Sequence, residues 1–152
     1  MNMIVFFQIK LLRIKMEKIN TSCNYDNSAK LILRLTIGFL MLFHGLGKIS
    51  HGVSGLEGMF ANSGLPSFIA YGAYLGEVIA PLMLIIGFKV RIAAVLIIGT
   101  MATAIGLAHP NDIFTRTNQG AWAIELQMLY LLGSLSIVLQ GAGKYSLDYL
   151  RK

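Results

Sequence analysis

Four long apolar segments dominate the sequence and restrict what the chain can fold into. They cover residues 31–48, 68–87, 92–109 and 122–140, and connections rich in Gly or Pro separate them. About 20 apolar residues in a helix cross the ~30 Å hydrocarbon core of a membrane, so each segment is long enough to span a bilayer. Because the connections are short, neighbouring helices should run antiparallel. The pattern predicts an all-α membrane protein, an antiparallel four-helix transmembrane bundle.

Composition excludes the main alternatives to a membrane protein. Of the 152 residues, 55% are hydrophobic and 13% are charged, whereas soluble domains have ~25% charged residues. This balance excludes a disordered chain and an ordinary water-soluble globule. The one cysteine, Cys23, excludes an internal disulfide framework, a CxxC redox pair and a cysteine zinc site. We therefore expect the lipid bilayer to be the main partner of the chain.

The basic residues predict the orientation of the bundle. Of the 13 Lys and Arg residues, all except Lys48 and Arg116 lie before the first apolar segment or at its start, between the second and third, or near the C-terminus. Cytoplasmic loops carry the excess of Lys and Arg, so both termini should face the cytoplasm of a bacterial inner (plasma) membrane. Because these residues flank apolar segments and do not form one water-facing patch, nucleic-acid binding is not expected.

The first 28 residues differ from the rest. They mix apolar and basic residues, and the positive charge follows the apolar stretch, whereas it precedes that stretch in a signal peptide. We predict a flexible basic tail over 1–28 and a four-helix transmembrane domain over 29–152. The alternative for the tail is a basic amphipathic helix on the inner leaflet.

Polar side chains within the apolar segments are the candidates for function, because a charge inside a bilayer costs ~2.5 kcal/mol or more. One face of the first segment is predicted to carry Arg34, Gly38, Met41, Gly45 and Lys48, with His44 on its flank. Small residues on such a face allow a second helix to approach closely. This face should point into the bundle.

The other segments add acidic groups. Glu77 lies one turn before Pro81, which has no backbone N–H, so the carbonyl of Glu77 should lose its helical partner. By depth, an outer layer of ligand or proton-site candidates is predicted to contain His44, Lys48, Glu77, His109 and Glu125. A charge network at the inner boundary is predicted to contain Arg34, Arg91, Ser146 and Asp148.

The outer layer has a structural and a functional interpretation. In the first, Glu77 and Glu125 pair with Lys48 and Arg34, or are protonated, and fix the register of the helices. In the second, the layer lines a pocket for a polar head group, a quinone or a proton path. Haem ligation by His44 and His109 is a minor alternative. No metal site is expected, since neither His has a second His or carboxylate one turn away on its own helix.

Several short motifs occur in a fixed order along the chain. They are RLTIG at 34–38, HGLGK at 44–48, GLP at 64–66, GE at 76–77, Gly87 followed by Arg91, Glu125, and GAGKYSLD at 141–148. Over about residues 30–150 this order resembles the DoxX family of small four-helix bacterial and archaeal membrane proteins. Some members are similar to the membrane subunit of a thiosulfate:quinone oxidoreductase, and others associate with redox or thiol-stress enzymes. The polar positions that correspond to the family pattern are Arg34, His44, Lys48, Glu77, Arg91, Glu125, Ser146 and Asp148.

The leading functional hypothesis is a quinone-interacting membrane subunit of a redox system, and thus at most a membrane subunit of an oxidoreductase. His44, Lys48 and Glu77 would hydrogen-bond the ring carbonyls of the quinone, with no covalently bound cofactor. A protein partner or a second copy of the chain would complete the system. The alternatives are a small proton-coupled transporter and a membrane anchor or scaffold for a soluble enzyme.

Overall fold

The computed structural model describes residues 3–151, and most of them are helical. Before Tyr25, only the side chains of Lys10 and Arg13 are described. The elements are α1 (Met3–His51), α2 (Ser54–Asn62), the 3₁₀ helix η1 (Ser67–Tyr71), α3 (Gly72–Tyr74), the π-helical turn η2 (Leu75–Ile79), α4 (Ala80–Ile86), α5 (Val90–Ala108), α6 (Glu125–Gln140) and α7 (Leu147–Leu150). Within the described residues there is no β-strand, only an isolated bridge between Arg116 and Trp122.

Among the residues that the structure describes, three helical stretches are long and apolar enough to cross a membrane. They are Tyr25–His51, Ser67–Ile86 and Val90–Ala108. The fourth predicted segment forms α6, which is apolar but shorter, with 16 residues. The prediction of an all-α protein with apolar, membrane-length helices is confirmed, while the antiparallel direction and the cytoplasmic placement of the termini stay predictions.

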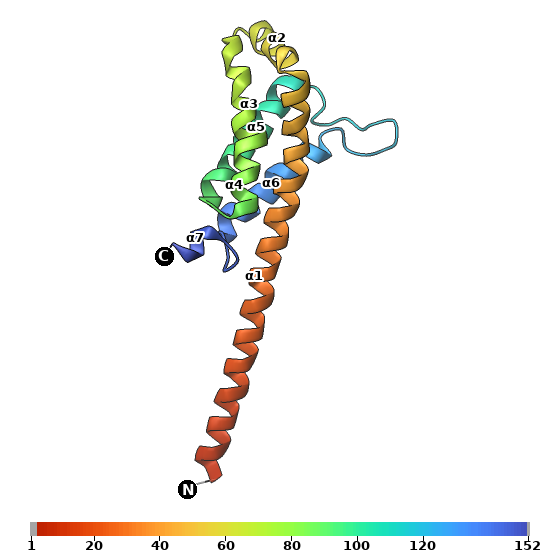
Figure 1. Ribbon diagram of the computed structural model, residues 1–152. Helices are drawn as coiled ribbons and strands as arrows, with labels where there is room; N and C mark the ends of the chain where they lie inside the picture. The colour runs from red at the N-terminus through yellow and green to blue at the C-terminus, as the bar shows by residue number, and fades with distance from the viewer. Residues whose placement is uncertain (1–2, 152) are drawn as a thin grey trace.

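Helix α1 is the longest element, and its N-terminal half continues beyond the other helices (Figure 1). The C-terminus and α7 lie near the level at which α1 leaves the bundle. The predicted boundary between residues 28 and 29 falls inside this continuous helix. The flexibility of the predicted tail stays a prediction.

Two boundaries differ from the sequence prediction. The stretch after the first apolar segment, predicted as a loop, contains α2. Leu56 lies one turn before Met59 and Phe60, and Phe60 packs in a buried cluster with Val53 and Ala70. The fourth helix begins at Glu125, three residues later than predicted. There the indole N–H of Trp122 donates to the carbonyl of Ile113 at 2.7 Å, which holds Trp122 in the preceding loop.

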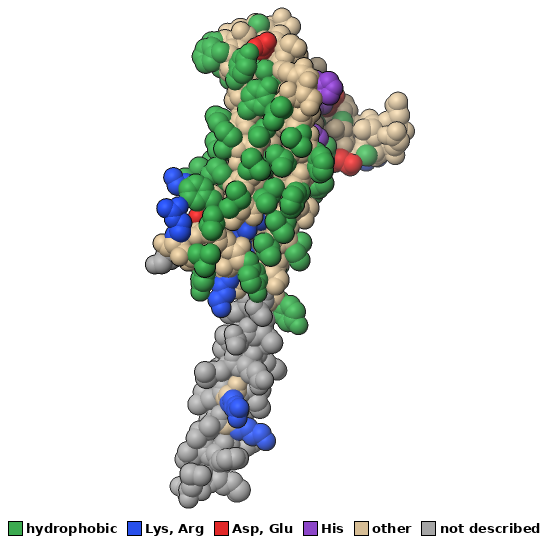
Figure 2. Space-filling model, viewed as in Figure 1, with side chains coloured by type: hydrophobic (Ala, Val, Ile, Leu, Met, Phe, Trp, Pro, Cys, Tyr) green, Lys and Arg blue, Asp and Glu red, His purple; other side chains and the backbone are tan. Residues whose placement is uncertain are grey.

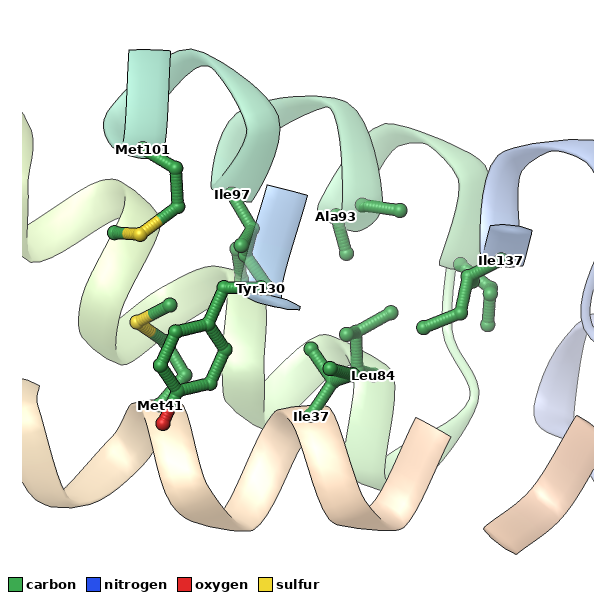
Figure 3. Packing of buried hydrophobic residues seen from close by; sticks show 11 residues of the cluster. Ile37, Met41, Leu84, Ala93, Ile97, Met101, Tyr130 and Ile137 are labelled. Atoms are coloured by element: carbon green, nitrogen blue, oxygen red, sulfur yellow. The ribbon is translucent and has the colours of Figure 1, made fainter. Parts of the chain in front are cut away.

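A compact apolar core joins the four apolar segments. Its buried members are Ile37, Met41, Ala80, Leu84, Val90, Ala93, Ala94, Ile97, Met101, Tyr130 and Ile137. Figure 3 shows Ile37 and Met41 of α1 pointing towards Leu84 and the ring of Tyr130. The core therefore ties α1 to α4, α5 and α6.

The outer faces of the same helices are apolar as well. Phe43, Ile92 and Leu139 are among the large apolar side chains that the bundle leaves exposed, and apolar side chains cover the visible flank of the bundle (Figure 2). A helix that is apolar on all sides is typical of a buried or membrane-spanning position. The exposed apolar flank thus fits contact with lipid acyl chains.

The predicted small-residue face of α1 is buried, as expected. Arg34, Gly38, Met41 and Gly45 all lie in the interior. A Cβ atom at Gly45 would overlap the carbonyl oxygen of Glu77, so only glycine lets α1 lie this close to η2. By contrast, Gly47 has nothing within 4 Å of such a Cβ position.

This difference between two glycines of one helix gives a direct test of the packing. We expect Gly45→Ala to lower the free energy of unfolding by about 1–3 kcal/mol, because backbone atoms of η2 would have to move. Gly47→Ala, the matched control, should leave it unchanged or raise it by up to ~1 kcal/mol through helix propensity. Reversible unfolding in detergent micelles measures both, and equal effects of the two substitutions would contradict the close approach.

Candidate functional site

The centre of the site is an ion pair between α1 and η2. The ammonium of Lys48 donates to Oε2 of Glu77, and the side chains are 26% and 7% exposed. A carboxylate buried to this extent is stable only with a charged partner and hydrogen bonds. Tyr74 supports the same contact, because its hydroxyl donates to the carbonyl of Lys48 at 3.2 Å. The pairing of Glu77 with Lys48 that the structural interpretation predicts is present.

The backbone around Glu77 departs from α-helix where Pro81 predicts a disturbance. Residues Leu75–Ile79 form a π-helical turn, and the N–H of Ala80 donates to the carbonyl of Leu75. Such turns insert one extra residue into a helix and are frequent at functional sites. Gly76 allows a second close approach here, since a Cβ would overlap the side chain of Thr100 in α5. The π turn and two glycines thus place Glu77 between α1 and α5.

Two cavities meet at the ion pair. The larger, about 340 Å³, is lined mainly by apolar side chains of α2, η1 and α5, such as Phe60, Ile69 and Leu107. The smaller, about 170 Å³, lies on the side of α6 and is lined by Met41, His44, Lys48, Glu77, Met101, Ala104, Leu126, Gln127 and Tyr130. Because Lys48, Glu77 and Ala104 border both, the ion pair forms a shared polar wall.

Polar groups gather in the smaller cavity. The rings of His44 and Tyr130 meet edge to face, with centroids 5.7 Å apart. The side-chain oxygen of Gln127 is buried and has no hydrogen-bond partner. Buried acceptors are nearly always satisfied, so this oxygen fits a site that receives a donor from a ligand or from water. The cavity can therefore supply donors from Lys48, His44 and Tyr130 and an acceptor from Gln127.

The structure brings together His44, Lys48 and Glu77 but not the other members of the predicted outer layer. His109 ends α5, and its Nδ1 lies 2.8 Å from Oδ2 of Asp112 in the following loop. Glu125 is exposed and lines neither of the two cavities. This corrects the predicted convergence: α6 turns Tyr130, Ser134 and Ile137 inwards. Glu125 shares its face instead with Leu129 and Leu132, which are exposed.

Gln127 is the functional candidate that sequence reasoning missed. It lies three residues before Tyr130, so both fall on the inward face of α6. An amide is neutral and therefore does not stand out among apolar residues as Glu125 does. Assigning the residues of the fourth apolar segment to helix faces, and selecting the face that carries Tyr130, identifies Gln127 as a candidate.

The predicted inner network consists of hydrogen bonds to the backbone, and no ion pair of the described residues joins its members. Arg34, 1% exposed, donates to the carbonyls of Leu84 at 3.1 Å, Ala142 at 2.5 Å and Tyr145 at 3.0 Å. Its guanidinium joins α1 to the end of α4 and to the segment before α7. Arg34 thus lies far from Glu125 in the fold, and that predicted pairing does not form.

Two other members of this network, Asp148 and Ser146, serve as helix caps. The carboxylate of Asp148 accepts from the N–H groups of Lys89 at 2.7 Å and Val90 at 2.9 Å, at the start of α5. Ser146 caps α7 by accepting from the N–H of Tyr149 at 3.2 Å. Such caps are worth about 1 kcal/mol each. Arg91 is exposed beside Gly141.

The buried ion pair predicts strong coupling between its two residues. Lys48→Met should destabilise the protein by about 3–5 kcal/mol because it leaves a buried carboxylate alone, and the double variant Lys48→Met/Glu77→Gln should recover part of this loss. The pair Asp26 and Lys30, 2.5 Å apart on α1, is the matched control because its carboxylate is 55% exposed, and its expected coupling is about 0.3–0.5 kcal/mol. Double-mutant cycles of unfolding in micelles measure both, and equal couplings would contradict burial of the Glu77 charge.

Comparison with known proteins places the chain in a family. The family model described as DoxX matches residues 29–110. A Bacillus subtilis (strain 168) protein named "Putative oxidoreductase CatD" is 32% identical over 118 residues, which cover 78% of this chain and 83% of that protein. A Haemophilus influenzae (strain ATCC 51907 / DSM 11121 / KW20 / Rd) protein named "Uncharacterized protein" is 30% identical over 120 residues, 76% of this chain and 85% of that protein. No solved structure matches. The chain is a multi-pass membrane protein and belongs to the DoxX family.

Proposed function

We propose that this protein is a quinone-interacting membrane subunit of a redox system. The observation that carries the proposal is the Lys48–Glu77 ion pair at the wall between an apolar cavity and a smaller cavity with polar groups. A quinone needs this combination, because it joins a polar ring to an isoprenoid tail. The larger cavity lies within the range of ~300–1,000 Å³ that is typical of small-molecule sites.

The polar groups suit both forms of such a ligand. The ring carbonyls of a quinone accept hydrogen bonds, which the ammonium of Lys48, the imidazole of His44 and the hydroxyl of Tyr130 can donate. The hydroxyls of a quinol donate, and the unpartnered oxygen of Gln127 can accept. A bound quinone would supply chemistry in which two electrons and two protons are taken up or released together.

In this proposal the ion pair carries out the proton transfer that accompanies quinone reduction or oxidation. Glu77 can accept a proton from the cavity and return it, and Lys48 stabilises the ionised carboxylate in between. Both side chains border the two cavities, so a proton on Glu77 is accessible from the larger cavity as well. In this proposal Lys48 and Glu77 hold and move the proton, while His44, Gln127 and Tyr130 orient the ring.

Electron transfer to or from the quinone requires a second component of the redox system. The printed name of the Bacillus subtilis relative contains the word oxidoreductase, which supports a redox role for this chain. A protein partner of the thiosulfate-oxidising or thiol-stress type, or a second copy of the chain, would deliver or remove electrons at the membrane face. The bacterial inner membrane, where quinones dissolve, is the proposed location.

Quinone titration of the purified protein tests the proposal. The fluorescence of Trp122 is the readout. Trp122 lies in the loop directly before α6, where its indole N–H donates a hydrogen bond within the same loop. Helix α6 carries Gln127 and Tyr130, so a ligand beside them should change the surroundings of the indole. Tyr130→Phe and Gln127→Leu should each weaken binding of a menaquinone or ubiquinone analogue about tenfold, the cost of one hydrogen bond. Glu77→Gln should weaken it at least as much.

Glu125→Gln is the matched control, since it makes the same chemical change at an exposed glutamate outside both cavities. It should bind like the unaltered protein. Absence of saturable binding, or identical traces for Glu77→Gln and Glu125→Gln, would overturn the proposal. In that case, solute uptake into proteoliposomes under a pH gradient tests the proton-coupled transporter.

A further inference from the structure

A basic groove lies at the end of the bundle opposite the ion pair. It has a volume of about 860 Å³ and lies where α1, the start of α5 and the segment after α6 meet. Its charged members are Lys89, Arg91, Lys144 and Asp148. The groove shares no residue with the two cavities of the proposed quinone site, so it stands independently of that proposal.

One rim of the groove is fixed by the turn between α4 and α5. Gly87 has φ +80° and Lys89 has φ +44°, and the left-handed conformation is unfavourable for a residue other than glycine. The carboxylate of Asp148 holds this turn by accepting from the N–H groups of Lys89 and Val90. The turn places the side chains of Lys89 and Arg91 along the same groove.

The other rim is formed by the glycine-rich segment after α6. Gly141 and Gly143 have φ +73° and +72°, and the backbone N–H of Lys144 donates to Oδ1 of Asn27 in α1 at 2.8 Å. The guanidinium of Arg91 lies over Gly141, since a Cβ there would be 3.6 Å from Nη2. The backbone on this side therefore leaves room beside the guanidinium.

The groove carries three basic side chains and one acidic side chain, so its net charge is positive. Among the described residues, the ion pairs join Lys30 to Asp26, Lys48 to Glu77 and His109 to Asp112, so none involves Lys89, Arg91 or Lys144. The ammonium of Lys89 lies 5.6 Å from the centroid of the Phe88 ring. Asp148 is the acidic member of the groove, and both of its oxygens already accept backbone N–H groups.

We propose that this groove binds a phosphate group through Arg91, Lys144 and Lys89. A guanidinium presents a planar fork of N–H donors that matches phosphate oxygens, and the lysines add mobile positive charge. Basic pockets at the ends of membrane helices bind lipid head groups in this way. The phosphate belongs either to an anionic lipid at the membrane surface or to a free phosphate compound.

Retention of lipid by the purified full chain tests the first source. The protein in detergent is mixed with phosphatidylglycerol or with diacylglycerol of the same acyl chains, and native mass spectrometry measures the bound lipid. Arg91→Gln/Lys144→Gln should reduce retention of phosphatidylglycerol at least tenfold. Lys10→Gln/Arg13→Gln, which removes one Lys and one Arg from exposed positions outside the groove, should retain it. Diacylglycerol should not be retained by any of them.

Inorganic phosphate tests the second source. Titrated into the lipid-free protein, it should raise the thermal unfolding midpoint of the unaltered chain and of Lys10→Gln/Arg13→Gln, but not of the groove variant. A positive result in either arm supports the phosphate site and identifies the source. If the two double variants behave alike in both arms, the proposal is overturned. Lys144→Gln alone keeps the backbone contact with Asn27 and serves if the double variant does not fold.

Discussion

The packing of the bundle around Glu77 depends on one constraint, that a buried carboxylate needs a partner of opposite charge. Surrounded by apolar helices, the Glu77 carboxylate needs a charge partner, and the ammonium of Lys48 provides one across the interface of α1 and η2. That contact forms only if the two backbones lie close together, which Gly45 allows. The π turn and Gly76 then bring the same residue next to α5. The two glycines, the π turn and the position of α1 therefore all serve to place one buried carboxylate beside its partner.

Arg34 is a second cation of α1, about four turns before Lys48. Its guanidinium is buried, but its partners are three carbonyl oxygens at the ends of other elements. Between the two cations, Gly38, Met41 and Gly45 fill the same face with small or apolar side chains. Helix α1 is therefore held to the bundle at two polar points with an apolar seam between them. Both cations lie on the segment that also borders the candidate quinone site.

The sequence allowed the helices and the α1 interface to be predicted, because basic and small residues recur together on one face of the first apolar segment. Periodicity also placed Glu77 beside the disturbance caused by Pro81. It could not orient α6, which is apolar on most of its surface, so Glu125 was expected inside although Gln127 and Tyr130 line the cavity. Depth alone grouped His109 with the outer layer, but its local contact with Asp112 depends on the path of the loop. Helix α2 is not predicted from the sequence, because its two glycines are typical of a loop.

Photoaffinity labelling with a ring-azido menaquinone analogue tests the central claim most directly, namely that a quinone ring lies against the Lys48–Glu77 wall. The account predicts labelling in peptides that line the two cavities, such as the α5 segment from Thr100 to Ala104. Excess unlabelled quinone should abolish this labelling. Labelling confined to the exposed side chains Phe43, Leu129 and Leu139, or unaffected by the competitor, would contradict the account.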